Sequence, residues 1–343
     1  MTKKFLARVS VAVFLAAVAL PARAETDDAF AKNLEDAAKR IKHAQELEKS
    51  DPFADRQMRG EAVVALGKIA DGYKAEADAL RPKFEALYEK YKRPGRGEKQ
   101  SFKDLADELV NAFNPWLKAD LCYVSTKVEQ VECYADNDPD KKKTGEEIAK
   151  LCQARANQDD VMEFPVIVAK YNYWRGRAWA AIQNERNACD AWKEALGQPE
   201  QDMAPEQKKG MFTIKKMILH DLIKMKIHAK SYGDVENIIV ETKVTPDLRS
   251  LFDEDAGKDL IIDYAKALAL PAEATAAEYE KAVKELRTAL EKEGKGDAGT
   301  KWANEFSCAI AEVMEEQRTN KPYLRPKLSA QEWYYAAHGL FIM

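Results

Sequence analysis

Residues 169–203 read AKYNYWRGRAWAAIQNERNACDAWKEALGQPEQDM, and their spacing indicates a specific helical architecture. Gly176 is followed three positions later by Trp179, and Ala188 is followed four positions later by Trp192. Small residues at such positions let two antiparallel helices approach closely, while large aromatic residues fill the space beside them. We therefore expect this stretch to form two helices that pack tightly against each other.

This spacing resembles that of the tetratricopeptide-repeat family, in which a helical hairpin recurs along the chain. Ala195 continues the pattern of the second helix, and Pro199 stands where one repeat would end. Two degraded copies follow, one with the turn sequence YGDV at residues 232–235 and one ending in the helical pattern of residues 276–292. The resemblance implies an all-α fold of antiparallel hairpins stacked as a right-handed superhelix. A related α-solenoid or a plain set of α-hairpins is the alternative, because the repeat period is irregular.

In the family that this segment resembles, the first helices line a concave groove that holds a peptide or a partner helix. Lys170, Tyr173 and Arg177 match the groove-facing positions. Two bases and an aromatic ring there would suit an acidic ligand or a C-terminal carboxylate. The alternative interpretation is an ordinary solvated helix face.

Composition indicates a globular helical protein with an acidic balance. The 343 residues are 46% hydrophobic and 33% charged, with only 15 glycines and a formal net charge of −4. Residues 1–24 contribute four bases and no acid, so the remainder carries 50 bases against 58 acids. A negative balance argues against nucleic acid or an anionic membrane as the main partner.

The N-terminal 24 residues have the pattern of a secretory signal peptide. Lys3 and Lys4 precede an apolar run over residues 9–20, and small residues at Ala22 and Ala24 flank a cleavable bond. We expect cleavage after Ala24 and a periplasmic or secreted mature chain. The apolar run is shorter than the roughly 20 residues that a membrane span needs, and no later segment is apolar enough for an integral span.

Residues 25–93 predict an N-terminal helical hairpin with coiled-coil-like apolar seams. A break is expected at Asp51 and Pro52, and Pro82 is expected to kink the second half or to start a new helix. Such a hairpin could form a homodimer or pack on its own chain. The glycine- and proline-containing stretch that follows it predicts a boundary, and we assign residues 98–343 to one tetratricopeptide-like repeat domain.

Five cysteines have to be interpreted in the light of export. In an oxidising compartment one or two disulfides could form among Cys122, Cys133, Cys152, Cys189 and Cys308, and at least one thiol must stay unpaired. Cys122 and Cys133 could pair only if the chain turned back between them, because eleven residues of continuous helix span roughly 16 Å. A bridge from Cys133 to Cys152 would close the polar loop between them.

The strongest candidate for a metal site is the polar loop after Tyr134. Asp136, Asp138, Asp140 and Glu147 have the spacing of the oxygen ligands in an EF-hand calcium loop. Lys141 stands where that loop needs glycine, and two further lysines follow it. A charged surface loop that caps the next helix at Glu146 is therefore the preferred interpretation, with calcium as the alternative.

No enzyme signature is present. The chain has no His-Glu-x-x-His zinc motif, no Gly-x-Ser-x-Gly elbow and no Cys-x-x-Cys-His haem attachment sequence, and no cofactor is predicted. We therefore predict a non-catalytic scaffold of the periplasm or cell envelope that binds a protein or peptide partner. An α-rich envelope enzyme or a calcium-linked module is the alternative.

Overall fold

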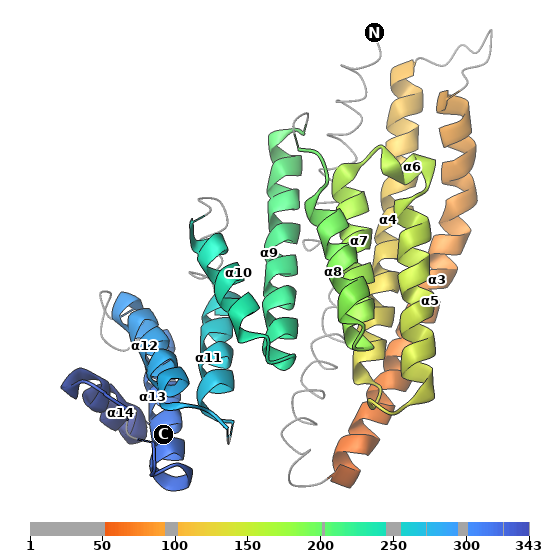
Figure 1. The fold of residues 1–343 in the computed structure, drawn as a ribbon. Helices are drawn as coiled ribbons and strands as arrows, with labels where there is room; N and C mark the ends of the chain where they lie inside the picture. The colour runs from red at the N-terminus through yellow and green to blue at the C-terminus, as the bar shows by residue number, and fades with distance from the viewer. Residues whose placement is uncertain are drawn as a thin grey trace. The chain divides into compact units, whose positions relative to one another are not determined.

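The structure is a computed structural model that describes residues 52–92, 102–200, 203–244, 255–271, 273–293, 301–324 and 326–342. Over these ranges the chain is helical and contains no strand, which confirms the predicted all-α class. The helices, labelled as in Figure 1, are α3 (Pro52–Lys92), α4 (Phe102–Cys133), α5 (Pro139–Ala156), α6 (Asp159–Met162), α7 (Pro165–Ala181), α8 (Glu185–Leu196), α9 (Pro205–His228), α10 (Tyr232–Val244), α11 (Asp255–Ala269), α12 (Ala276–Glu293), α13 (Lys301–Asn320) and α14 (Ala330–Ile342). The predicted signal peptide and residues 25–51 of the predicted hairpin lie outside the described residues.

The chain divides into two compact units, with the division at Lys215 and Lys216 inside α9. None of the helices in the described ranges is both long and apolar enough to cross a membrane.

In the first unit, α3, α4 and α5 follow one another as antiparallel neighbours, and α7 packs on both α5 and α8 (Figure 1). One apolar core joins these helices. Its largest fully buried side chains include Phe84, Phe113, Trp116, Leu117 and Tyr171. The described part of the predicted N-terminal hairpin is therefore packed on its own chain, through α4.

Pro82 does not start a new helix, because α3 runs without interruption from Pro52 to Lys92. A proline inside a helix costs about 3 kcal/mol through the lost hydrogen bond and the clash with the preceding turn. Phe84 and Tyr88, which follow Pro82 in α3, are 2% and 7% exposed, so their burial in the core of the first unit offsets that cost. Of the two alternatives expected at Pro82, the start of a new helix was wrong.

Residues 121–133 belong to α4, although they carry many side chains that favour strands. Val124, Val128 and Val131 are all fully buried on one side of the helix. Their spacing of four and three matches the helical period, so the pattern of burial overrides the strand propensity of valine.

The second unit has its own core, formed chiefly by α11, α12, α13 and α14. Local sequence determines how two of these helices begin. Thr275 and Glu278 form a reciprocal capping box before α12, and Ser329 and Glu332 do the same for α14. Lys321 is buried, and its ammonium donates to the carbonyls of Ala269, Leu270 and Pro271, so it satisfies the C-terminal end of α11.

Candidate functional site

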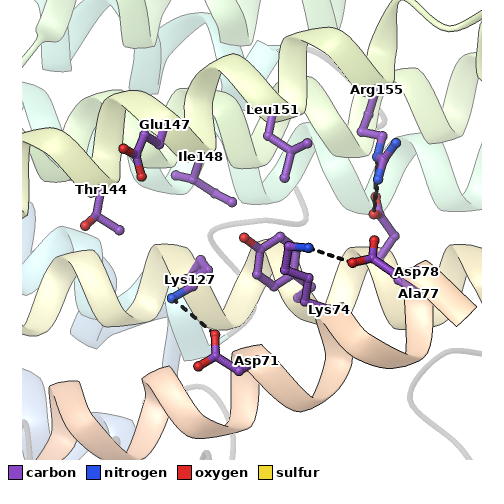
Figure 2. Close-up of a pocket in the computed structure, with 12 residues that line it drawn as sticks. Asp71, Lys74, Ala77, Asp78, Lys127, Thr144, Glu147, Ile148, Leu151 and Arg155 are labelled. Atoms are coloured by element: carbon purple, nitrogen blue, oxygen red, sulfur yellow. Dashed lines mark hydrogen bonds and ion pairs between the residues drawn. The ribbon is translucent and has the colours of Figure 1, made fainter.

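A polar groove lies where α3, α4 and α5 meet, and we call it the three-helix groove (Figure 2). Its volume is about 440 Å³. Helix α3 contributes one wall, α5 contributes the other, and α4 lies between them. The lining residues are Asp71, Lys74, Ala77, Asp78, Asp120, Tyr123, Lys127, Thr144, Glu147, Ile148, Leu151 and Arg155. Both apolar and charged side chains therefore line this one cavity.

Two lysines of the groove are paired with carboxylates of α3. Lys74 Nζ lies 2.6 Å from Asp78 Oδ2, and the hydrogen bond to Asp78 raises the pKa of Lys74. Lys127 Nζ lies 4.0 Å from Asp71 Oδ1 and also donates to Gln130 Oε1 at 3.0 Å. The pair of Lys74 and Asp78 is exposed, and such pairs contribute only about 0–1 kcal/mol, so a ligand can exchange with either partner at little cost. Lys127 is 19% exposed, and Asp71 lies at the limit of ion-pair distance from it.

Asp120 anchors a buried polar network at one end of the groove. Its carboxylate is 1% exposed and accepts three contacts from Arg155, the shortest being 2.9 Å from Nη2 to Oδ1. Tyr171 Oη donates to Oδ2 at 2.6 Å. Helices α4, α5 and α7 are thereby tied through one carboxylate, and burial beside this anion raises the pKa of Tyr171 far above its ordinary range.

Trp116 forms the apolar support behind this network. Its ring stacks on Phe84 with a centroid distance of 5.4 Å and an interplanar angle of 6°. The guanidinium of Arg81 lies 4.3 Å from the Trp116 centroid, and that of Arg155 lies 5.7 Å from it. Arg81 also reaches Asp160 at 2.8 Å. The Trp116 ring therefore supports both arginines, and each arginine pairs with one buried carboxylate, Arg81 with Asp160 and Arg155 with Asp120.

The helix pair expected from residues 169–203 is formed by α7 and α8. A Cβ atom placed on Gly176 would lie 2.1 Å from Nε1 of Trp192, so glycine is required for the observed approach. The same indole N–H donates to the carbonyl oxygen of Tyr173 at 3.2 Å. Ala188 and Trp192 are 0% and 1% exposed. The small-and-large packing predicted from the spacing is present.

Lys170, Tyr173 and Arg177, the predicted groove residues, do not line the three-helix groove. Tyr173 is 4% exposed and packs against Trp174. Arg177 pairs with two carboxylates of α4, Glu129 at 3.0 Å and Glu132 at 2.5 Å. Tyr173 therefore belongs to the core, and Arg177 links α7 to α4 through ion pairs.

Lys170 makes the stability of the chain depend on pH, because burial lowers the pKa of its ammonium group to about 8. In the unfolded chain this pKa keeps its ordinary value of 10.5, so below pH 8 the buried positive charge lowers the free energy of unfolding. That penalty disappears as the pH rises from 8 to 10.5. We expect Lys170→Met to raise the free energy of unfolding by about 1 kcal/mol at pH 7 and to give no gain above pH 10. Urea unfolding of the wild-type and Lys170→Met chains between pH 7 and pH 10.5 measures this difference. A gain in stability that is independent of pH would contradict the lowered pKa of Lys170.

The four residues with EF-hand spacing do not lie in one loop. Asp138 caps α5 by accepting the backbone N–H of Asp140 at 2.9 Å, and Asp136 pairs with Lys141 at 2.6 Å. Because α5 begins directly after Asp138, Asp140 and Glu147 lie on one helix, about 10 Å apart along its axis. Within the described ranges, no group of three or more His, Cys, Asp or Glu side chains could hold a metal ion. A charged cap is present, but it lies at Asp138 and not at the predicted Glu146, because α5 already begins at Pro139.

All five cysteines are free thiols. Cys122 and Cys133 lie on the continuous helix α4, where a bridge between them is geometrically excluded. Burial raises the pKa of Cys133 to about 12 and raises that of Cys152 still further. These two thiols are therefore protonated at neutral pH and serve as small apolar core residues.

Sequence reasoning missed the groove and its buried anion. One signal was available, since Asp120 stands four residues from both Trp116 and Val124, inside an apolar stripe of α4. Comparisons give no further assignment: no family model, curated protein or solved structure matches this chain.

Proposed function

We propose that this chain is a non-catalytic, exported helical scaffold of the periplasm or cell envelope that binds a protein or peptide partner, and that the three-helix groove is its binding site. The groove is the observation that carries the proposal. It is a cavity of about 440 Å³, within the usual size range of ligand sites, and it combines charged side chains with apolar ones.

A peptide segment fits the chemistry of the groove. Every residue of a peptide backbone carries one donor and one acceptor, and the lining offers ammonium donors at Lys74 and Lys127 and carboxylate acceptors at Asp71 and Glu147. Ile148 and Leu151 give apolar contact for side chains. The α3 wall from residue 71 to residue 78 is about 10 Å long, which matches about three residues of extended chain.

The helix packing supports a repeat-like scaffold as the frame for such a site. Besides Gly176 on α7, Gly145 of α5 permits a close approach, because an added Cβ would lie 2.4 Å from Cγ2 of Ile182. Successive helix pairs closed by small residues are the packing that the tetratricopeptide resemblance leads us to expect. We extend the proposal to a right-handed solenoid on this basis.

Site-specific photocrosslinking tests the binding site. A photoreactive amino acid replaces Thr144, which points into the groove in Figure 2, and in a matched chain it replaces Lys150, which is 70% exposed on the same helix. Irradiation in cells of the source is expected to join one defined protein to the Thr144 chain and not to the Lys150 chain. Lys127→Glu should reduce that product at least fivefold, whereas Arg177→Gln should leave it unchanged.

Two results would contradict the proposal. Equal crosslinking from both positions would mean that the groove is not the binding site. Loss of the product in Arg177→Gln with retention in Lys127→Glu would move the site to the position expected from the sequence resemblance. Export is tested separately, by N-terminal sequencing of the chain recovered from its source, with Glu25 as the expected first residue.

A further inference from the structure

Helix α14 presents an apolar face to solvent. Trp333 is 54% exposed, Tyr334 66%, Leu340 53% and Phe341 90%. With exposed Ala337, these residues cover one contiguous arc of the helix, because they recur at spacings of three and four. We call this arc the α14 stripe. Four large hydrophobic side chains on one helix face form a patch that a soluble domain normally keeps covered.

The opposite side of α14 is firmly held within the second unit. Ala336 is 5% exposed, and a Cβ atom added to Gly339 would lie 2.0 Å from the carbonyl oxygen of Ser307 on α13. Glu332 is buried and pairs with Arg287 of α12 at 2.9 Å. The stripe is therefore the outward face of a docked helix and not the result of a detached segment.

The stripe carries no charge. Glu332 is the only Asp, Glu, Lys or Arg residue between positions 330 and 341, and it faces inward against Arg287. His338 is exposed beside the stripe and stacks on Tyr334, with ring centroids 6.5 Å apart. In a chain that is 33% charged, this is an unusual surface. A charged surface that pairs with its own copy brings like charges together, whereas this face meets its copy without that repulsion.

The arrangement of side chains is symmetric about Ala337. Trp333 and Phe341 each lie four positions from it, and Tyr334 and Leu340 each lie three positions from it. When two copies of α14 cross antiparallel on a two-fold axis at Ala337, Trp333 meets the partner's Phe341 and Tyr334 meets the partner's Leu340. The small side chain at the crossing point lets the two helices approach closely.

The area is sufficient for a weak dimer. An aromatic side chain buries about 200 Å², so the exposed fractions on the stripe correspond to roughly 500 Å² per copy and about 1,000 Å² for two copies. Specific interfaces begin at about 1,000 Å² of total buried area. The stripe reaches that threshold with aromatic side chains on both sides of Ala337, and aromatic residues are among those that dominate binding energy at interfaces.

We propose that the α14 stripe is a homodimer interface, in which a second copy of this chain packs antiparallel across Ala337. This assigns self-association to α14 of the second unit, whereas the three-helix groove and the predicted hairpin belong to the first unit.

Sedimentation velocity of the full chain from 1 to 200 µM measures the association. Wild type is expected to shift from monomer to dimer over this range, and Ala337→Glu is expected to weaken the dissociation constant at least tenfold by placing two like charges at the axis. Gln331→Glu is the matched control, since Gln331 is exposed on the same helix outside the stripe, and it should retain the dimer. A wild-type monomer at 200 µM, or equal dimerisation by Ala337→Glu, would overturn the proposal.

Two further chains test the geometry. Ala337→Cys is expected to give a disulfide-linked dimer within minutes of mild oxidation, well above the level seen with wild type or Gln331→Cys under the same conditions. Trp333→Glu combined with Phe341→Lys should dimerise at least tenfold more tightly than either single variant, because antiparallel packing pairs the opposite charges. If neither effect occurs and wild-type monomer instead sediments with neutral phosphatidylcholine vesicles, the stripe faces a lipid surface and the dimer is excluded.

Discussion

Asp120→Asn is expected to lower the free energy of unfolding of the first unit by about 3 kcal/mol. The amide keeps the shape of the side chain but removes the charge that Arg155 faces at 2.9 Å. It also replaces one of the two acceptor oxygens with an NH2 donor, so the hydrogen bonds from Arg155 and from Tyr171 can no longer all be accepted. The guanidinium would then remain largely buried without a counter-charge. Removing one member of a buried ion pair costs far more than the intact pair contributes, because the remaining charge cannot recover its hydration.

Hydrogen exchange followed by mass spectrometry checks this prediction locally. Because the chain has two units, a single unfolding midpoint would mix their stabilities. Amides of α4, α5 and α7 should exchange faster in Asp120→Asn, while those of α11 to α14 serve as an internal reference. Asp78→Asn is the matched control, since Asp78 is 59% exposed in its pair with Lys74, and it should change stability by less than about 0.5 kcal/mol.

A double variant separates the loss of the ion pair from a general loss of packing. When Arg155→Leu is added to Asp120→Asn, no charge is left behind at the site, and we expect at least half of the lost stability to return. If the double variant is less stable than Asp120→Asn alone, Arg155 contributes mainly through its packing on Trp116, and the network is not the reason for the loss.

The all-α class could be predicted from the sequence because the apolar residues on the buried side of a helix recur every three or four positions. Val124, Val128 and Val131 recur at helical spacing, and all three are fully buried on one side of α4. The new helix expected as one alternative at Pro82 is absent for a complementary reason. The cost of a proline is local and visible in the sequence, whereas the compensating contacts of Phe84 with Phe113 and Trp116 come from a distant segment, α4.

The candidate site was not predictable in the same way. Lys74, Lys127 and Glu147 lie on three helices, and each one alone looks like part of a solvated helix face. Only the packing of α3, α4 and α5 brings them to one cavity. Asp120 differs, because the sequence shows that it lies in an apolar stripe between Trp116 and Val124 and so predicts its burial. The sequence does not show that Arg155 is its partner.

The central helix pair gives the second large effect, since Gly176→Ala is expected to lower the free energy of unfolding by about 2 kcal/mol. The added methyl group would lie 2.1 to 2.6 Å from three atoms of the Trp192 indole, and that ring is 1% exposed and has no free space to enter. Overpacking of this kind costs about 1–3 kcal/mol. It outweighs the gain of about 1 kcal/mol that alanine brings to a helix in place of glycine.

Gly72→Ala in α3 is the matched control, because no atom lies within 4 Å of a Cβ at that position. There the helix propensity acts alone, and stability should rise by about 0.5–1 kcal/mol. The two substitutions are chemically identical, so opposite signs in urea unfolding would isolate the contact with Trp192. In a Trp192→Phe background the cost of Gly176→Ala should fall, because the smaller ring leaves room for the methyl group.

This comparison tests the interpretation of residues 169–203 more sharply than the existence of two helices does. Any α-hairpin would have formed α7 and α8, but only a close approach at Gly176 produces a penalty that depends on the indole. If Gly176→Ala instead stabilised the chain as Gly72→Ala does, α7 and α8 would not meet at that point. The tetratricopeptide-like packing inferred from the spacing of Gly176 and Trp192 would then fail, although the fold would still be helical.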